Sequence, residues 1–138
     1  MDRRRMGNPS AKDAIVAMGM VVAPMARERR TQVRQTMLRY DAVQSGRLIF
    51  RFVLGKELPT LAVAPAKKLL RELHDEKMRH TDLVMLDAVD GPKLEPACSC
   101  GEKTVAWIQF ALAKWPRLRF IGKTEDDTCI GRATETPH

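Results

Sequence analysis

Aromatic side chains, cysteines and long apolar runs are all scarce in this sequence of 138 residues, and each shortage excludes a class of protein. Phe, Trp and Tyr make up 5% of the residues, and no platform for stacked nucleobases is apparent. Three cysteines cannot build a disulfide framework, and the spacing Cys98-Ser99-Cys100 lacks the two-residue gap of common zinc knuckles. The longest apolar candidate, 14–25, is shorter than the roughly 20 residues that span a bilayer.

What the sequence does contain is enough for one hydrophobic core and a strongly basic first segment. Hydrophobic residues make up 44% and charged residues 30%, so we expect a single globular domain or part of one. Residues 1–51 hold 11 Lys and Arg against 4 Asp and Glu, whereas residues 52–138 hold 13 of each sign. Such a basic segment is typical of proteins that bind nucleic acid, an acidic membrane surface or a phosphorylated small ligand.

Hydrophobic periodicity predicts strands and helices in alternation. A basic tail at 1–12 comes first, and residues 90–101, rich in Pro and Gly, are expected to form a loop. Alternation of this kind is typical of a mostly parallel sheet with helices on both faces, which is the α/β class. We expect strands at 14–22, 48–54, 82–89 and 118–121, and helices at 27–40, 66–78 and 102–114.

Three consecutive carboxylates follow the last predicted strand: Glu125, Asp126 and Asp127. In open parallel sheets ligands bind outside the carboxyl ends of the strands, near the point where the strand order reverses, and we expect the triplet to lie on that rim. Adjacent carboxylates repel one another unless a cation or solvent compensates, and their hard oxygen atoms suit Mg²⁺ or Mn²⁺ that also grips a diphosphate. A solvated acidic turn is the alternative, and it is the commoner fate of such a tripeptide.

Four segments follow one another in an ordered pattern over roughly residues 14–130: VAPMARERRTQVRQTM at 22–37, RFVLG at 51–55, DEKMRHTDLVMLDAVD at 75–90 and KTVAWIQFALAKWPRLRFIGKTEDD at 103–127. In order and spacing they resemble the beta-1,3-galactosyltransferase-like family, glycosyltransferase family 31. The first segment places Arg30, Val33, Arg34 and Thr36 on the family pattern. Met37 stands where the family has Trp, and we expect it to fill a core position because Met adapts to irregular gaps. Trp107 and Trp115 are also interpreted as packing residues.

The resemblance implies a Rossmann-like GT-A fold that binds a UDP-sugar through a divalent cation, Mn²⁺ or Mg²⁺. It implies transfer of a hexose of the galactose or N-acetylglucosamine type to a glycan acceptor, with inversion and commonly in a beta-1,3 linkage. Asp127 would be the metal ligand, with Glu125 and Asp126 near the ribose or the waters of the metal. Four cations on matching positions would serve the nucleotide or its phosphates: Arg30, Arg34, Lys103 and Lys123. Glu125 departs from the family's Asp by one methylene group.

The family's acceptor-binding half and its general base lie downstream of the acidic triplet, so we expect residues 13–131 to be the donor-binding half of a truncated domain, with 132–138 as a tail. The catalytic base is therefore not assigned. The resemblance also implies residence in the Golgi apparatus, with membrane attachment only through an anchor outside this sequence. Two other functions stay open: an inactive nucleotide-sugar-binding fragment, and a basic nucleic-acid binder using 1–9 and 27–35, which the low aromatic content disfavours.

Overall fold

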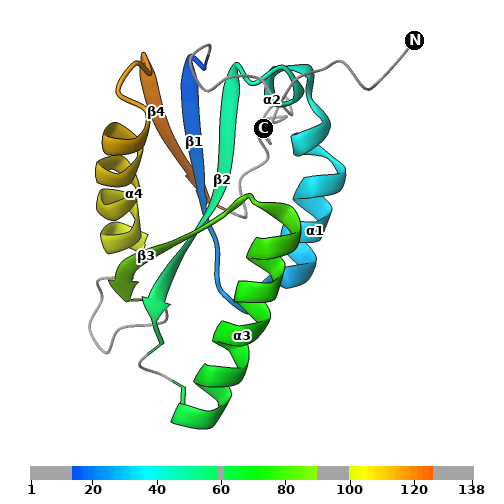
Figure 1. Ribbon diagram of the computed structural model, residues 1–138, viewed down its shortest axis with the longest axis vertical. Helices are drawn as coiled ribbons and strands as arrows, with labels where there is room; N and C mark the ends of the chain where they lie inside the picture. Colours follow the sequence, from blue (N-terminus) through cyan, green and yellow to red (C-terminus); the bar gives the residue numbers. More distant parts are fainter. Residues whose placement is uncertain (1–13, 59–60, 90–99, 126–138) are drawn as a thin grey trace, which may run out of the picture.

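The chain folds around one parallel β-sheet, as the alternation of strands and helices predicts (Figure 1). The computed structural model describes residues 14–58, 61–89 and 100–125. Its strands are β1 (Val16–Val21), β2 (Leu48–Glu57), β3 (Leu83–Val89) and β4 (Phe120–Glu125), in the order β3-β2-β1-β4. Every neighbouring pair is parallel. The predicted α/β class is confirmed.

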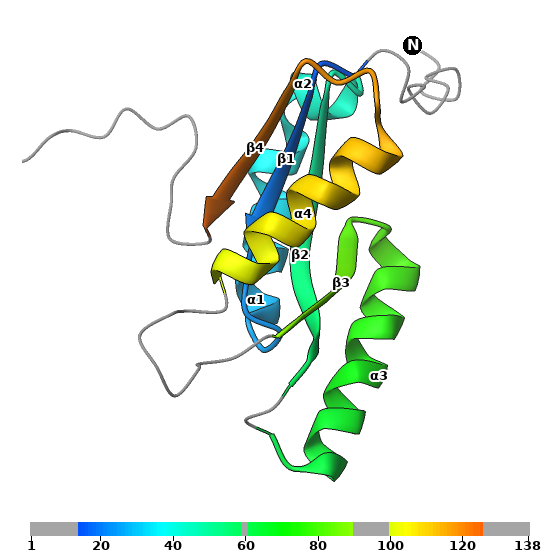
Figure 2. The same cartoon turned by 90° about the vertical axis from the view of Figure 1, so that its left-hand side faces the viewer.

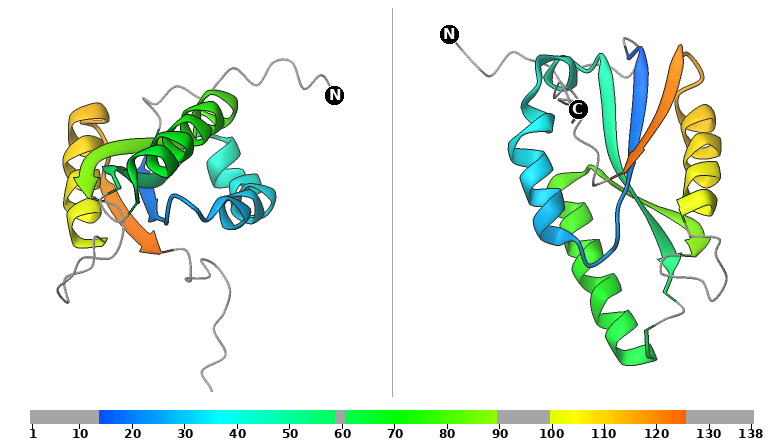
Figure 3. Two further views of the ribbon diagram at one scale, coloured as in Figure 1. Left: turned by 90° about the horizontal axis from the view of Figure 1, so that it is seen from below. Right: turned by 180° about the vertical axis from the view of Figure 1, so that it is seen from behind.

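Helices cover both faces of the sheet, which explains why its two central strands are so apolar (Figures 2 and 3). Helices α1 (Arg27–Gln35) and α3 (Val63–His80) lie on one face, and α4 (Cys100–Lys114) lies on the other. A short 3-10 helix, η3 (Met37–Arg39), and a single helical turn, α2 (Asp41–Gln44), lead from α1 to β2. The result is a three-layer arrangement with a separate core on each side of the sheet.

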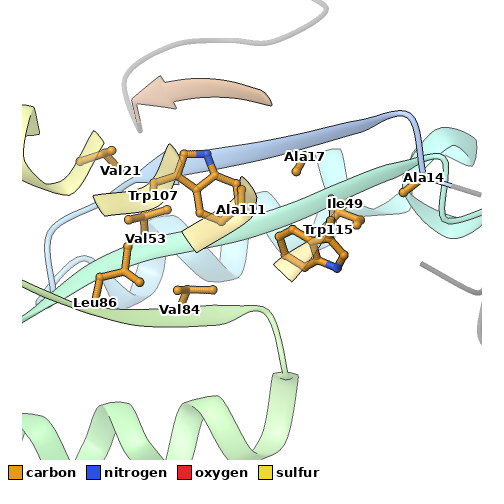
Figure 4. Close-up of a cluster of buried hydrophobic side chains, with 10 residues drawn as sticks. All are labelled: Ala14, Ala17, Val21, Ile49, Val53, Val84, Leu86, Trp107, Ala111 and Trp115. Carbon is orange, nitrogen blue, oxygen red and sulfur yellow. The ribbon is translucent and has the colours of Figure 1, made fainter. Parts of the chain in front are cut away.

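The core under α4 is organised by Trp107 (Figure 4). Its ring is fully buried, and its Nε1 donates a hydrogen bond of 2.9 Å to the carbonyl oxygen of Gly122 in β4. The ring lies directly over Gly19 of β1, where a Cβ atom would be only 2.5 Å from Trp107 Cε2. Trp115 is buried beside it, with the two ring centroids 6.1 Å apart. Both tryptophans therefore pack in the core, as predicted.

The opposite core lies between the sheet and helices α1 and α3. Val33 of α1 and Leu73 of α3 are buried against the side chains of Phe50, Phe52 and other apolar strand residues. The Phe50 and Phe52 rings meet edge to face with centroids 5.4 Å apart. Met37 packs against this cluster as a partly buried side chain, so the expectation that it fills a core position is confirmed.

Several element boundaries differ from the predicted ones for local reasons. The first helix ends at Gln35 because Thr36 leaves the helical conformation, at φ −117° and ψ −81°, and its hydroxyl donates to the Gln32 carbonyl. Helix α3 begins at Val63, because Pro65 falls in the first turn, where its missing N–H breaks no intrahelical bond. Cys100 and Gly101 belong to α4, whereas the rest of the predicted loop, 90–99, lies outside the described residues.

The end of the last strand, β4, is the boundary that matters for the candidate site. It begins at Phe120 and continues to Glu125, whereas the sequence predicts its end at Ile121. Glu125 is therefore the final residue of β4 and pairs in register with Val21, the final residue of β1. The prediction failed here because Gly122, Lys123 and Thr124 are poor in apolar surface, yet the backbone still pairs with β1, whose second half is buried.

Replacing Gly19 by Ala is expected to lower the free energy of unfolding by about 1–3 kcal/mol, because the added methyl group overlaps the fixed Trp107 ring. Gly101→Ala is the matched control. A Cβ atom at Gly101 meets nothing within 4 Å, and Ala favours a helix over Gly by up to about 1 kcal/mol. Urea denaturation of the two variants measures both effects. Equal stability of Gly19→Ala and the wild type would contradict the packing described for Trp107.

Candidate functional site

The strand order reverses between β1 and β4. From β1 the chain moves to β2 and then to β3 on one side of the sheet, and it returns to the other side of β1 with β4. Ligands of open parallel sheets bind at such a reversal, outside the carboxyl ends of the strands. The ends of β1 and β4 and the start of α4 lie at the same end of the sheet (Figure 2). We therefore take the carboxyl ends of β1 and β4, together with the start of α4, as the candidate site and call this position the β1/β4 crevice.

Glu125 and Lys123 form the β4 side of this crevice. The Lys123 ammonium donates to Glu125 Oε1 at 2.9 Å, and the two side chains are 31% and 44% exposed. Side chains two residues apart on a strand share a face, and Ile121 on that face packs against the core under α4. Lys123 and Glu125 thus lie on the α4 side of the sheet. Asp126 and Asp127 follow directly in the sequence and lie outside the described residues.

Lys103 forms the α4 side of the crevice. It occupies the first turn of α4 and is 2% exposed, an unusual position for an ammonium group. Its Nζ donates a hydrogen bond of 3.2 Å to the carbonyl oxygen of Val22, the residue after β1. A buried charge needs such partners, because removing it from water is otherwise costly. The crevice therefore has a cationic group from α4 fixed to the end of β1.

Arg30 and Arg34 lie on the opposite face of the sheet, in an ion network with Glu76 and Asp82. Arg30 Nε is 2.7 Å from Glu76 Oε1, and Arg30 Nη2 is 2.9 Å from Glu76 Oε2. Arg34 binds both oxygen atoms of Asp82 at 2.8 Å and also reaches Glu76 Oε1 at 2.9 Å. The network ties α1 to α3 and to the residue before β3. Two positive and two negative charges cancel inside it.

The electrostatics of the network favour its ionised form. Burial opposes ionisation of Glu76, but hydrogen bonds from Arg30 and Arg34 and their positive charges outweigh it, so the pKa of Glu76 lies below its ordinary value of 4.5. For Arg34, burial acts to lower the pKa, but the bonds to Asp82 and Glu76 dominate and raise it. The Arg34 guanidinium also lies 5.1 Å from the centroid of the Phe52 ring, a cation–π contact.

The structure therefore divides the predicted site residues into two groups. Lys103 lies at the end of β1, and Lys123 and Glu125 lie at the end of the neighbouring strand β4. Arg30 and Arg34 have carboxylate partners on the other face of the sheet, and direct contact between them and a nucleotide stays a prediction. Sequence reasoning missed those partners, Glu76 and Asp82, because 46 and 48 residues separate them from their arginines. The available signal was an acidic residue directly before an apolar strand.

A metal site cannot be built from the described ranges alone. Residues 14–58, 61–89 and 100–125 contain no group of three or more His, Cys, Asp or Glu side chains that could hold a metal ion. Glu125 is the one member of the acidic triplet within those ranges. The predicted ligand Asp127 and its neighbour Asp126 lie outside them, so their roles stay predictions.

Comparison with known protein families places most of the chain in one of them. The model of the galactosyltransferase family matches residues 28–134, which is most of the chain. The matched region contains the ion network, the start of α4 and the whole of β4. A search of the curated proteins found no match.

Replacing Glu76 by Gln should lower the free energy of unfolding at pH 7 by about 3 kcal/mol, because it leaves buried guanidinium charge without its carboxylate. The pKa of Glu76 is lower in the folded protein than the ordinary value of 4.5, so its ionised form stabilises the fold above pH 4.5. That stability is lost as the pH falls through the folded pKa. The variant should lack this part of the acid sensitivity, which denaturation at a series of pH values measures.

Glu72→Gln is the control, because Glu72 is exposed one turn earlier on the same helix. It should keep the stability of the wild type at pH 7 and its loss of stability in acid. If Glu76→Gln matched Glu72→Gln at every pH, the network would not contribute to folding.

Proposed function

Because the chain belongs to the galactosyltransferase family, we propose that it binds a UDP-sugar in the β1/β4 crevice and serves transfer of a hexose to a glycan acceptor. The family identifies a glycosyltransferase, and it implies a nucleotide-sugar donor and a glycan acceptor. The observation that supports the placement is the position of Lys103, bonded to the end of β1, and of the Lys123–Glu125 pair at the end of β4, on either side of the strand-order reversal. A galactose-type or N-acetylglucosamine-type donor, inversion and a beta-1,3 linkage are the finer parts of the proposal.

Each crevice residue has a role that its chemistry allows. Lys103 and Lys123 would donate charge-assisted hydrogen bonds to the diphosphate, one from each side of the crevice. Glu125 and Asp126 would approach the ribose or the waters of a bound metal. Glu125 suits this position because its side chain is 44% exposed at the end of β4 and already accepts a bond from Lys123. Arg30 and Arg34 would contribute from the ion network with Glu76 and Asp82, on the other face of the sheet, where their positive charge would favour the nucleotide phosphates.

Asp127 would hold Mn²⁺ or Mg²⁺. The oxygen atoms of Glu125, Asp126 and Asp127 are hard donors, which are the ligands that these cations prefer. Glu125 fits such a site, since its carboxylate is 44% exposed at the end of β4 and is bonded to the Lys123 ammonium. When bound, the cation would neutralise charge on the leaving diphosphate. The crevice residues themselves would bind and orient the donor.

The family also suggests the domain organisation and the cellular location of this protein. We propose that residues 13–131 form the donor-binding half of a GT-A domain whose acceptor half and general base lie downstream. The family is typically associated with the Golgi apparatus, and we propose that location here. Within the described part of the chain, no helix has the length and apolarity to cross a membrane.

The ion network weighs against nucleic-acid binding. Two arginines of the basic first segment, Arg30 and Arg34, are paired with Glu76 and Asp82 rather than displayed on the surface. The surface charge of that segment is correspondingly smaller than its composition indicates. A phosphorylated small ligand is the partner class that remains best supported.

Mn²⁺ together with UDP should raise the thermal midpoint of the wild-type chain, because a ligand that binds only the folded state stabilises it by mass action. Asp127→Ala should abolish the rise. Asp75→Ala, which removes an exposed carboxylate from α3, is the control and should keep it. Differential scanning fluorimetry with Mn²⁺, UDP and both together measures the effect. The same rise in Asp127→Ala as in the wild type would exclude Asp127 as the metal ligand.

Lys123→Gln should weaken UDP binding roughly tenfold and leave uridine binding nearly unchanged, because the ammonium serves only the phosphates. The free energy of unfolding should fall by less than about 1 kcal/mol, since the Lys123–Glu125 pair is partly exposed. Lys56→Gln is the matched control and should keep wild-type affinity for UDP. Lys56 also lies on a strand and pairs with a carboxylate, Asp87 at 3.4 Å, but it is on the β2/β3 side of the sheet. Calorimetric titration of both variants with UDP and with uridine measures the affinities. Equal losses for both ligands would remove Lys123 from the phosphate site.

A further inference from the structure

The loop between β1 and α1 begins at the carboxyl end of β1, beside the candidate site, and cations hold it from both faces of the sheet. Lys103 of α4 donates to the Val22 carbonyl at 3.2 Å. Arg30 of α1 donates to the next two carbonyls, through Nη1 to Ala23 at 3.0 Å and through Nη2 to Pro24 at 3.1 Å. Three consecutive carbonyl oxygen atoms at the carboxyl end of β1 therefore accept bonds from two buried side chains.

We propose that Arg30 is a positioning residue of the donor site, which fixes the β1–α1 loop and thereby the Val22 carbonyl to which Lys103 is bonded. This inference rests on the proposed function, since it gives Arg30 a role in UDP binding. It replaces direct contact with the donor by an indirect one, because the guanidinium is already bonded to both oxygen atoms of Glu76 and to two loop carbonyls. Arg30 holds the loop, the loop fixes the Val22 carbonyl that Lys103 bonds, and Lys103 would bond the diphosphate.

The geometry requires an arginine at this position. The planar guanidinium binds the two loop carbonyls and both oxygen atoms of Glu76 at the same time. An ammonium group has three donors on one nitrogen and cannot span these acceptors. Glu76 fixes the direction of the guanidinium through two parallel bonds of 2.7 and 2.9 Å. Without Arg30, Glu76 and the carbonyls would have to find water or stay unpaired.

The loop itself is short and internally bonded, so a displacement at one residue moves its neighbours. The amide of Ala26 donates to the Ala23 carbonyl at 3.0 Å, and the amide of Arg27 donates to the Met25 carbonyl at 2.9 Å. Behind it, Pro24 and Arg30 line a cleft of about 160 Å³ between the start of α1 and α3. Loss of the guanidinium would enlarge this cleft and remove the support under the loop.

Arg34 supplies the matched control. It lies one turn later on α1 and bonds the same Glu76, but its other partner is Asp82 rather than the loop. Arg30→Lys and Arg34→Lys therefore each keep a positive charge in the network, whereas only the first removes bonds to the Ala23 and Pro24 carbonyls. A merely structural role for Arg30 predicts the same ligand affinities in both variants once both are folded.

The test is calorimetric titration of the full chain with UDP in Mn²⁺ and with uridine, combined with amide hydrogen exchange. Arg30→Lys should weaken UDP binding roughly tenfold more than Arg34→Lys, with a smaller effect on uridine. Exchange at the Ala26 and Arg27 amides should be slow in the wild type and in Arg34→Lys, and fast in Arg30→Lys. Wild-type exchange is informative even if a variant does not fold: fast exchange at these two amides would overturn the inference.

The outcomes separate this inference from the proposed function. If the wild type binds UDP and the two variants lose equal affinity, Arg30 has no positioning role and the proposed function stands. If the wild type binds no UDP in Mn²⁺, the proposed function fails, and the role of Arg30 in donor binding fails with it. Slow exchange at Ala26 and Arg27 would then show only that the loop is held.

Discussion

The sharing of one buried carboxylate, Glu76, by two arginines is the interaction on which this structure depends. Glu76 is 4% exposed, so its charge is tolerated only because Arg30 and Arg34 both bond it. Those bonds fix α1 against α3, and through Asp82 they fix both helices to the start of β3. Across the described residues, every buried side-chain nitrogen and oxygen atom has a hydrogen-bond partner. The network specifies how the two helices lie on the sheet, which apolar packing alone does less strictly.

The two faces of the sheet contribute differently to the crevice and meet at one loop. On the α4 face, Trp107 fits over Gly19 and bonds Gly122, which sets α4 against β1 and β4 and brings Lys103 to the end of β1. On the other face, Arg30 supports the following carbonyls. A donor site at this position would therefore be built on regular elements, with its cations held by neighbouring groups before any ligand arrives. Such preorganisation reduces the cost of ordering side chains on binding.

Much of the fold could be predicted from the sequence because its signals are local. Apolar runs such as 48–54 marked buried strands, and the alternation with amphipathic helices marked a parallel sheet. Only part of the candidate site could be predicted from such local signals. Lys103, Lys123 and Glu125 lie at the ends of β1 and β4, and their contacts with a donor stay predictions. The pairing of Arg30 with Glu76 joins residues 46 apart, and a cation on a helix gives no local sign of whether it faces solvent, ligand or a buried acid. Only the packing of α1 against α3 decides that.

The central claim, that a metal-bound nucleotide occupies the crevice between β1 and β4, is tested most directly by paramagnetic broadening of amide NMR signals. Mn²⁺ with UDP should broaden the signals of Val21, Val22, Thr124 and Glu125 at the carboxyl ends of these strands and leave those of Val16, Leu48 and Phe120 at the opposite end sharp. Diamagnetic Mg²⁺ with UDP should shift the first group without broadening it. Broadening centred on the opposite end of the sheet, or on the outer face of α1, would contradict the assignment of the site.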